Sequence, residues 1–247
     1  MRATAIEFRL RMLINAILIV LGFWAPWIDA FRIGARVSLL EWTALEISRL
    51  GVLPFHLATP LVILLATLLA AAGAVFRVWG SAYLGPAVVI HPDMSAEALM
   101  AGGPYRLVRN PLYLGLWLMA AALAFLMPPT GALFTMVLLT FFLMRLILGE
   151  EAFLVAQLAE PYRAYLQAVP RLFPRLRSSL PRSSGEGRWL QAIFSELTPI
   201  GVFVSIAVLS WSYDSRLIER AILVSFGASL VVRALMPGLR REQGPAR

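Results

Sequence analysis

The sequence predicts an all-α fold, a polytopic integral membrane bundle of about six transmembrane helices. Of its 247 residues, 60% are hydrophobic and 15% charged, and the mean hydropathy is +0.76. These values lie outside the usual range of soluble domains. Several apolar stretches also approach the roughly 20 residues that cross about 30 Å of hydrocarbon. Most of the chain is therefore expected to lie in lipid.

Six apolar segments are the predicted spans. They cover residues 12–28, 57–76, 112–127, 131–149, 190–213 and 217–236. The first follows Arg2, Arg9 and Arg11, as the apolar region of a signal peptide would, but no cleavage site of small residues comes after it. It is therefore expected to be a retained helix.

The arginines predict an orientation with both termini in the cytoplasm. This arrangement places 17 of the 22 arginines inside and five outside, in agreement with the positive-inside rule. The net charge of +8 thus comes from arginines that flank apolar segments, and it does not indicate nucleic-acid binding. Without cysteine, and with only His56 and His91, the chain is expected to hold no metal site of the cysteine or histidine type.

The spacing of the segments predicts the domain organisation. The sequence MPPTG between the third and fourth spans leaves room only for a tight hairpin of antiparallel helices. The long segments 77–111 and 150–189 flank this hairpin, and a site assembled from both is expected. We divide the chain into N-terminal helices (1–76), a core that contains the hairpin (77–177), a linker (178–189) and a C-terminal helix pair with its tail (190–247).

The first of the long segments ends in GPYRLVRNPLY, which predicts a helix start at Asn110 and Pro111. Such an end presents free N–H groups and the positive end of the helix dipole, which favour anions. Arg106 and Arg109 precede it and would add to the attraction. Anchoring to the cytoplasmic surface would also explain the two arginines.

The fourth span ends in two adjacent carboxylates, Glu150 and Glu151. Charged groups at this depth are costly unless they are paired or used. Because neighbours on a helix differ by about 100°, they cannot serve one role from one face. Glu151 shares the face of Leu154 and Leu158, which should pack inward, whereas Arg145 is badly spaced for either glutamate and is expected to pair elsewhere or to reach the cytoplasmic surface.

After these carboxylates, EPYRAYLQAVPRLFP places Tyr162 and Tyr165 at helical spacing before Arg171. The ordered combination of GPYRLVRNPLY, an apolar hairpin, the paired glutamates and these residues resembles the isoprenylcysteine carboxyl methyltransferase and phospholipid methyltransferase family. The resemblance covers about residues 75–175, including RVWGSAYLG. It departs from the family at Asn110, where histidine is usual, and at Leu158 and Ala159, where phenylalanine and glycine are common.

The resemblance implies a site for S-adenosylmethionine, without a Rossmann domain, at the cytoplasmic ends of the helices. Its implied cofactor-binding residues are Arg106, Arg109, Asn110, Tyr113, Glu150, Glu151, Tyr162 and Tyr165, and its implied catalytic residues are Glu150, Glu151 and Arg171. No metal is implied. Arginine and the helix start would hold a carboxylate, and a glutamate would bind ribose hydroxyls or the amino group.

The expected function is methyl transfer to a lipophilic small molecule or lipid, with a carboxylate or an amine as the acceptor group. The expected location is the plasma (inner) membrane of a prokaryote, in contact with membrane lipids and with the site on the cytoplasmic side. Two alternatives stay open: an NADPH-dependent membrane reductase resembling sterol reductases, and a non-catalytic membrane protein. The sequence gives no prediction of the oligomeric state.

Overall fold

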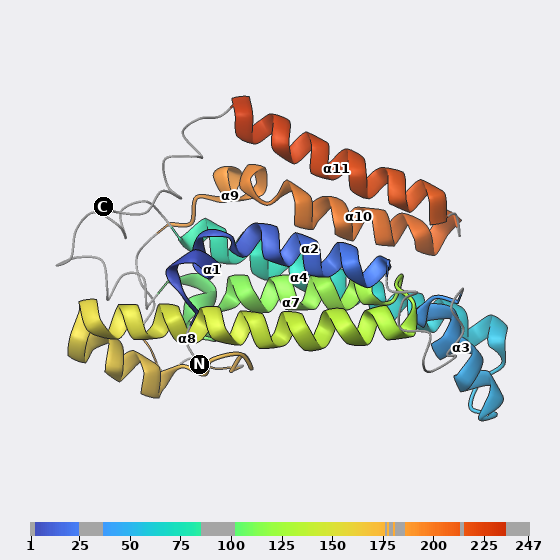
Figure 1. Ribbon diagram of the computed structural model, residues 1–247, viewed down its shortest axis with the longest axis horizontal. Helices are drawn as coiled ribbons and strands as arrows, with labels where there is room; N and C mark the ends of the chain where they lie inside the picture. Colours follow the sequence, from blue (N-terminus) through green and yellow to red (C-terminus); the bar gives the residue numbers. More distant parts are fainter. Residues whose placement is uncertain are drawn as a thin grey trace.

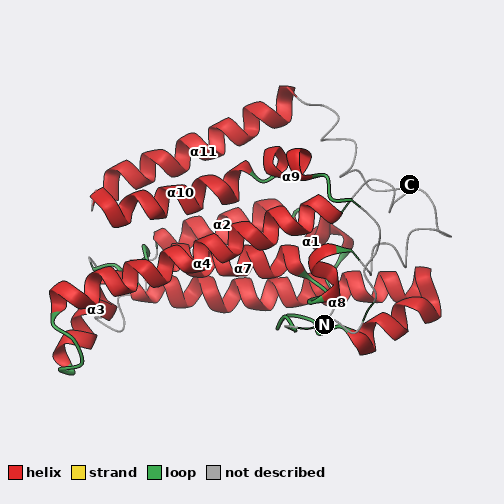
Figure 2. Ribbon diagram, turned by 180° about the vertical axis from the view of Figure 1, so that it is seen from behind, coloured by secondary structure: helices red, strands yellow, loops and turns green. Residues whose placement is uncertain are grey.

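The computed structural model describes residues 3–24, 37–84, 102–175, 177, 180, 186–212 and 215–235. Within these residues every regular element is a helix, and the long helices lie side by side along one axis (Figures 1 and 2). The α-helices are α1 (Ala5–Arg9), α2 (Arg11–Phe23), α3 (Leu39–Arg49), α4 (Phe55–Tyr83), α7 (Pro111–Ala124), α8 (Pro129–Ala168), α9 (Trp189–Ser195), α10 (Leu197–Ser212) and α11 (Ser215–Leu235). A short 3-10 helix, η2, covers Gly103–Arg106. The all-α prediction is therefore confirmed for the described residues.

Two helices, α4 and α8, are long and apolar enough to cross a membrane. The pair α9 and α10 would make a third span, but it is bent by 70° at Glu196, so the single helix expected over 190–213 was wrong. Helices α2 and α7 are apolar but shorter. The count of six spans remains a prediction.

The hairpin of α7 and α8 forms as predicted. Helix α7 begins at Pro111 and α8 at Pro129, and the two helices pack against each other (Figure 1). Proline suits the first turn of a helix because its missing N–H has no partner there in any case. The turn is also anchored from outside the hairpin, since the backbone N–H of Leu39 donates to the carbonyl of Met127 at 2.8 Å.

Helices α4 and α7 touch backbone to backbone. A Cβ atom built on Gly73 would lie 2.9 Å from the carbonyl oxygen of Gly115, too close for any side chain. Further along, Gly80 leaves room for Leu112 at the start of α7. Close glycine contacts of this kind are typical of helix pairs in membranes. They fix the start of α7 against the last turns of α4.

Helix α8 extends past the rest of the bundle and then turns back (Figure 1). The turn falls at Ala159, whose φ of 48° and ψ of −123° are not helical, just before Pro161. Residues with a side chain seldom adopt positive φ, whereas glycine does so freely. Ala159 is also the position where glycine is common in the resembled family.

The short helix α1 binds the side of α8. Thr4 and Glu7 form a capping box at its start, and the carboxylate of Glu7 accepts a hydrogen bond from Arg145 at 2.8 Å. The backbone N–H of Ala3 also donates to the carbonyl of Arg145 at 3.1 Å. The prediction that Arg145 pairs away from Glu150 and Glu151 is therefore confirmed.

Candidate functional site

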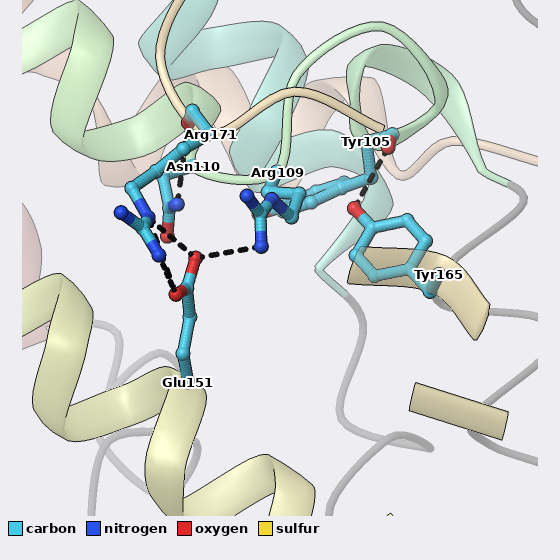
Figure 3. A network of polar contacts seen from close by, with 6 residues as sticks. All are labelled: Tyr105, Arg109, Asn110, Glu151, Tyr165 and Arg171. Atoms are coloured by element: carbon cyan, nitrogen blue, oxygen red, sulfur yellow. Dashed lines mark hydrogen bonds and ion pairs between the residues drawn. The ribbon is translucent and has the colours of Figure 1, made fainter. Parts of the chain in front are cut away.

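Glu151 lies at the centre of an ionic cluster with Arg109 and Arg171 (Figure 3). Its side chain is 8% exposed. One carboxylate oxygen lies 3.1 Å from an Arg109 nitrogen, and Arg171 donates through Nε and a terminal nitrogen, the shortest contact being 2.7 Å. A fork of two donors on one carboxylate fixes orientation as well as distance.

Two segments far apart in the sequence meet at this cluster. The backbone N–H of Arg109 donates to the carbonyl of Pro170 at 2.9 Å, and the Asn110 amide donates to the carbonyl of Arg171 at 3.3 Å. The loop before α7 and the loop after α8 are thereby held together. Asn110 occupies the N-cap position of α7, but its side chain makes this cross-link and does not cap the helix.

The cluster carries more positive than negative charge. Arg109 and Arg171 both pair with Glu151, which leaves one unit of positive charge uncompensated by this carboxylate. Hydrogen bonding to Glu151 raises the pKa of Arg171, so this guanidinium stays charged. Loss of one charged hydrogen bond in such a partly buried cluster typically costs about 1.5–3 kcal/mol.

Glu150 points to a different neighbour. Its carboxylate accepts a hydrogen bond from the Tyr113 hydroxyl at 2.8 Å. Among the described residues, no arginine forms an ion pair with it. The expectation that the two glutamates cannot act from one face is therefore confirmed, and Glu150 keeps lone pairs that a further donor could use.

Tyr162 and Tyr165 lie on the helical segment after the break at Ala159. Their ring centres are 5.6 Å apart, and they pack with Val169 and the partly buried Leu154 and Leu158. The Tyr165 hydroxyl donates to the backbone carbonyl of Tyr105 at 2.8 Å (Figure 3). The turn in α8 thus brings Tyr165 to η2, while Leu154 and Leu158 share the inward face with Glu151 as predicted.

Three buried donors near the cluster have no hydrogen-bond partner among the described groups. They are Nε of Arg106, Nε of Arg109 and the hydroxyl of Tyr105. Arg106 also donates from a terminal nitrogen to the carbonyl of Leu180 at 2.6 Å. Burial raises the pKa of Tyr105, so its hydroxyl remains a donor. Buried donors are normally satisfied, and each exception needs an explanation.

Sequence reasoning missed Tyr105 and Glu196. Tyr105 lies inside GPYR, but a single aromatic residue before two arginines carries no separate signal. Glu196 was recognisable in principle, because it is an isolated carboxylate within an apolar segment. Elsewhere in the described chain, no three histidine, cysteine, aspartate or glutamate side chains gather as metal ligands would.

In the part of the chain that the structure describes, apolar helices long enough to cross a membrane carry a cluster of ionisable side chains around Glu151. Residues 61–160 match the model of the phospholipid methyltransferase family. The resemblance seen in the sequence is therefore confirmed over this region. The match includes Tyr105, Glu150 and Glu151 but ends before Arg171. No curated protein and no solved structure matches the chain.

Proposed function

We propose that the protein transfers a methyl group from S-adenosylmethionine to a lipophilic acceptor at the membrane. The observation that carries the proposal is the pairing of Glu151 with Arg109 and Arg171, because it joins two segments beside the apolar helices. Glu151 and Arg109 both belong to the segment that matches a methyltransferase family. Residues 77–177 would form the catalytic core.

The unpartnered groups fit this cofactor. S-adenosylmethionine carries a carboxylate, which needs donors, and an ammonium and ribose hydroxyls, which need acceptors. Nε of Arg106, Nε of Arg109 and the hydroxyl of Tyr105, which have no partner among the described groups, are such donors. Glu150, with one hydrogen bond from Tyr113, is such an acceptor. These residues would hold the cofactor, with Tyr162, Tyr165 and Asn110 shaping the site.

When bound, the cofactor supplies a methyl group on a positively charged sulfur. A lone pair of the acceptor would form the new bond to the methyl carbon, while the electrons of the sulfur–carbon bond stay on sulfur. A carboxylate acceptor needs no base, because a neutral ester results. An amine acceptor must lose a proton, and Glu150 could accept it. Low polarity around the site would favour either reaction by limiting hydration of the charged reactants.

The acceptor is expected to be lipophilic and to approach from the bilayer. Large apolar side chains are exposed along the outer faces of the helices, among them Leu64 and Leu68 on α4 and Val137 and Phe141 on α8. Such surfaces are expected to contact lipid tails. With the orientation from the arginines, the cofactor would enter from the cytoplasm of a prokaryotic cell.

Binding by the purified protein tests the proposal. Titration in detergent with S-adenosylmethionine and, separately, NADPH should give saturable binding of the first only. Lipophilic carboxylates, amines and thiols then serve as acceptors in an assay of methyl transfer. Binding of NADPH alone would favour the reductase, and binding of neither would favour a non-catalytic role.

A further inference from the structure

A second buried ion pair joins the C-terminal helices to the matched segment. Arg77 of α4 donates through Nε and a terminal nitrogen to Glu196, with both hydrogen bonds at 2.8 Å. The Ser81 hydroxyl also donates to Glu196. The side chains of Arg77 and Glu196 are 20% and 6% exposed. Glu196 lies outside residues 61–160, at the break between α9 and α10.

Packing alone does not account for this pair. Burying two charges costs desolvation energy, and apolar residues of similar volume often hold a structure together equally well. The chain moreover bends by 70° at Glu196. One continuous apolar helix could pack against α4 without this bend and without a buried charge. Ionisable side chains in apolar segments mark functional positions by default.

Arg77 also contacts the helix that starts at the candidate site. A Cβ atom built on Gly115 would lie 2.9 Å from Cγ of Arg77 and 3.0 Å from its backbone nitrogen. The Arg77 side chain thus lies directly on the backbone of α7. Gly115 comes two residues after Tyr113, whose hydroxyl binds Glu150. Arg77 and Glu150 therefore both contact the first turns of α7, so a shift of Arg77 would displace the helix that carries Tyr113.

Tyr105 links η2 to the Glu151 cluster. Its hydroxyl is buried without a partner among the described groups. Its backbone carbonyl accepts the hydrogen bond from Tyr165, which holds η2 at the ionic cluster (Figure 3). A buried hydroxyl without a hydrogen-bond partner costs free energy, because the protein interior has a low dielectric constant.

We propose that Glu196 is a positioning residue for methyl transfer, which acts through Arg77 on the start of α7. The C-terminal helices would then be part of the active unit. The inference rests on the proposed function, because it concerns the same site. It adds that methyl transfer requires Glu196, which lies outside the residues that match the family.

The test replaces both charges without leaving either one unpaired. Arg77→Met combined with Glu196→Leu keeps the volume and should retain the unfolding temperature. If Glu196 positions the site, kcat should fall about tenfold or more, because small displacements near reacting groups can cost up to about 100-fold. KM for the acceptor should change little. Glu46→Gln, which breaks the exposed pair with Arg49 on α3, is the matched control and should change neither value.

A milder variant keeps the test informative if the double replacement does not fold. Ser81→Ala removes one hydrogen bond to Glu196 and leaves both charges, and it should lower kcat about 2- to 10-fold. A normal kcat in the folded double variant overturns the inference and leaves the proposed function standing. If the double variant does not fold, a normal kcat in Ser81→Ala has the same meaning. Absence of methyl transfer by the wild-type protein on every acceptor class overturns the proposed function, and the inference with it.

Discussion

Arg171 binds the carboxylate of Glu151 through two of its nitrogen atoms, although α8 ends and the chain reverses between the two residues. Arg109, in the loop before α7, binds the same carboxylate. The Glu151 side chain therefore joins α8 to the loop before α7 and to the loop after α8. Its removal should disturb the site more than the replacement of any surface charge.

Glu151→Gln and Arg109→Ala should each weaken binding of S-adenosylmethionine. Loss of a charged hydrogen bond in a partly buried site costs about 1.5–3 kcal/mol, or about 10- to 150-fold in affinity. Isothermal titration in detergent measures the change, and circular dichroism checks the fold. Arg163→Ala is the control, because Arg163 pairs with Glu160 at the surface. Unchanged affinity in both site variants would place the cofactor elsewhere.

Longer apolar tails on the acceptor should raise turnover at low acceptor concentration. Each methylene group kept in hydrocarbon contributes about 0.8 kcal/mol, so a longer tail should raise the acceptor's concentration in the membrane and its apparent affinity. The measurement compares acceptors with one head group and increasing tail length in nanodiscs, at the same added concentration. The partitioning of each acceptor into the nanodiscs is measured separately. Equal turnover for short and long tails would point to a soluble acceptor.

Ala159→Gly should stabilise the protein. The positive φ of Ala159 strains a residue with a side chain, whereas glycine adopts it freely. After subtraction of the greater entropy of glycine in the unfolded chain, the gain should be about 0.5–1 kcal/mol. Thermal unfolding in detergent measures it. Ala156→Gly, in the regular part of the same helix, should instead destabilise by about 1 kcal/mol, and a gain in both would contradict the explanation.

The contact between Glu7 and Arg145 should weaken in acid. Hydrogen bonds from the Thr4 backbone and from Arg145 lower the pKa of Glu7 to about 2, below the usual value of 4.5. A lowered pKa means that the stabilising contribution is complete above pH 4.5 and is lost as the pH falls toward 2. The difference in unfolding temperature between wild type and Glu7→Gln should therefore be largest near neutral pH and vanish near pH 2. A constant difference across this range would contradict the assignment.

The orientation can be tested with single cysteines, because the protein has none of its own. Val52 lies between α3 and α4, and Glu186 lies just before α9. Val52→Cys should react with an impermeant thiol reagent in intact cells, whereas Glu186→Cys should react only after permeabilisation. The reverse pattern would place the candidate site outside the cell.

Local signals in the sequence predicted much of the fold. The start of α7 at Asn110 and Pro111 was predicted, because proline acts on its own turn. Helical spacing assigned Glu151 to the inward face, and poor spacing excluded Arg145 as its partner. These predictions needed only the geometry of one helix.

Contacts between distant segments could not be predicted in this way. The pairing of Arg171 with Glu151 depends on the break at Ala159, where the sequence has alanine and no glycine marks a turn. The partners of Glu196 lie more than 100 residues away, on α4. The hydroxyl of Tyr105 has no partner among the described groups because of the way η2 packs. The residues around Tyr105 in the sequence give no indication of this packing.

The straight part of α8 also relates the site to the thickness of the bilayer. Glu151 lies 22 positions after Pro129, which is about 33 Å along a helix. The hydrocarbon layer of a typical membrane is about 30 Å thick. A thinner bilayer would make α8 tilt and a thicker one would draw the carboxylate toward the lipid tails. The chain length of the lipids would therefore change the depth of Glu151 in the bilayer, because the helix from Pro129 to Glu151 has a fixed length.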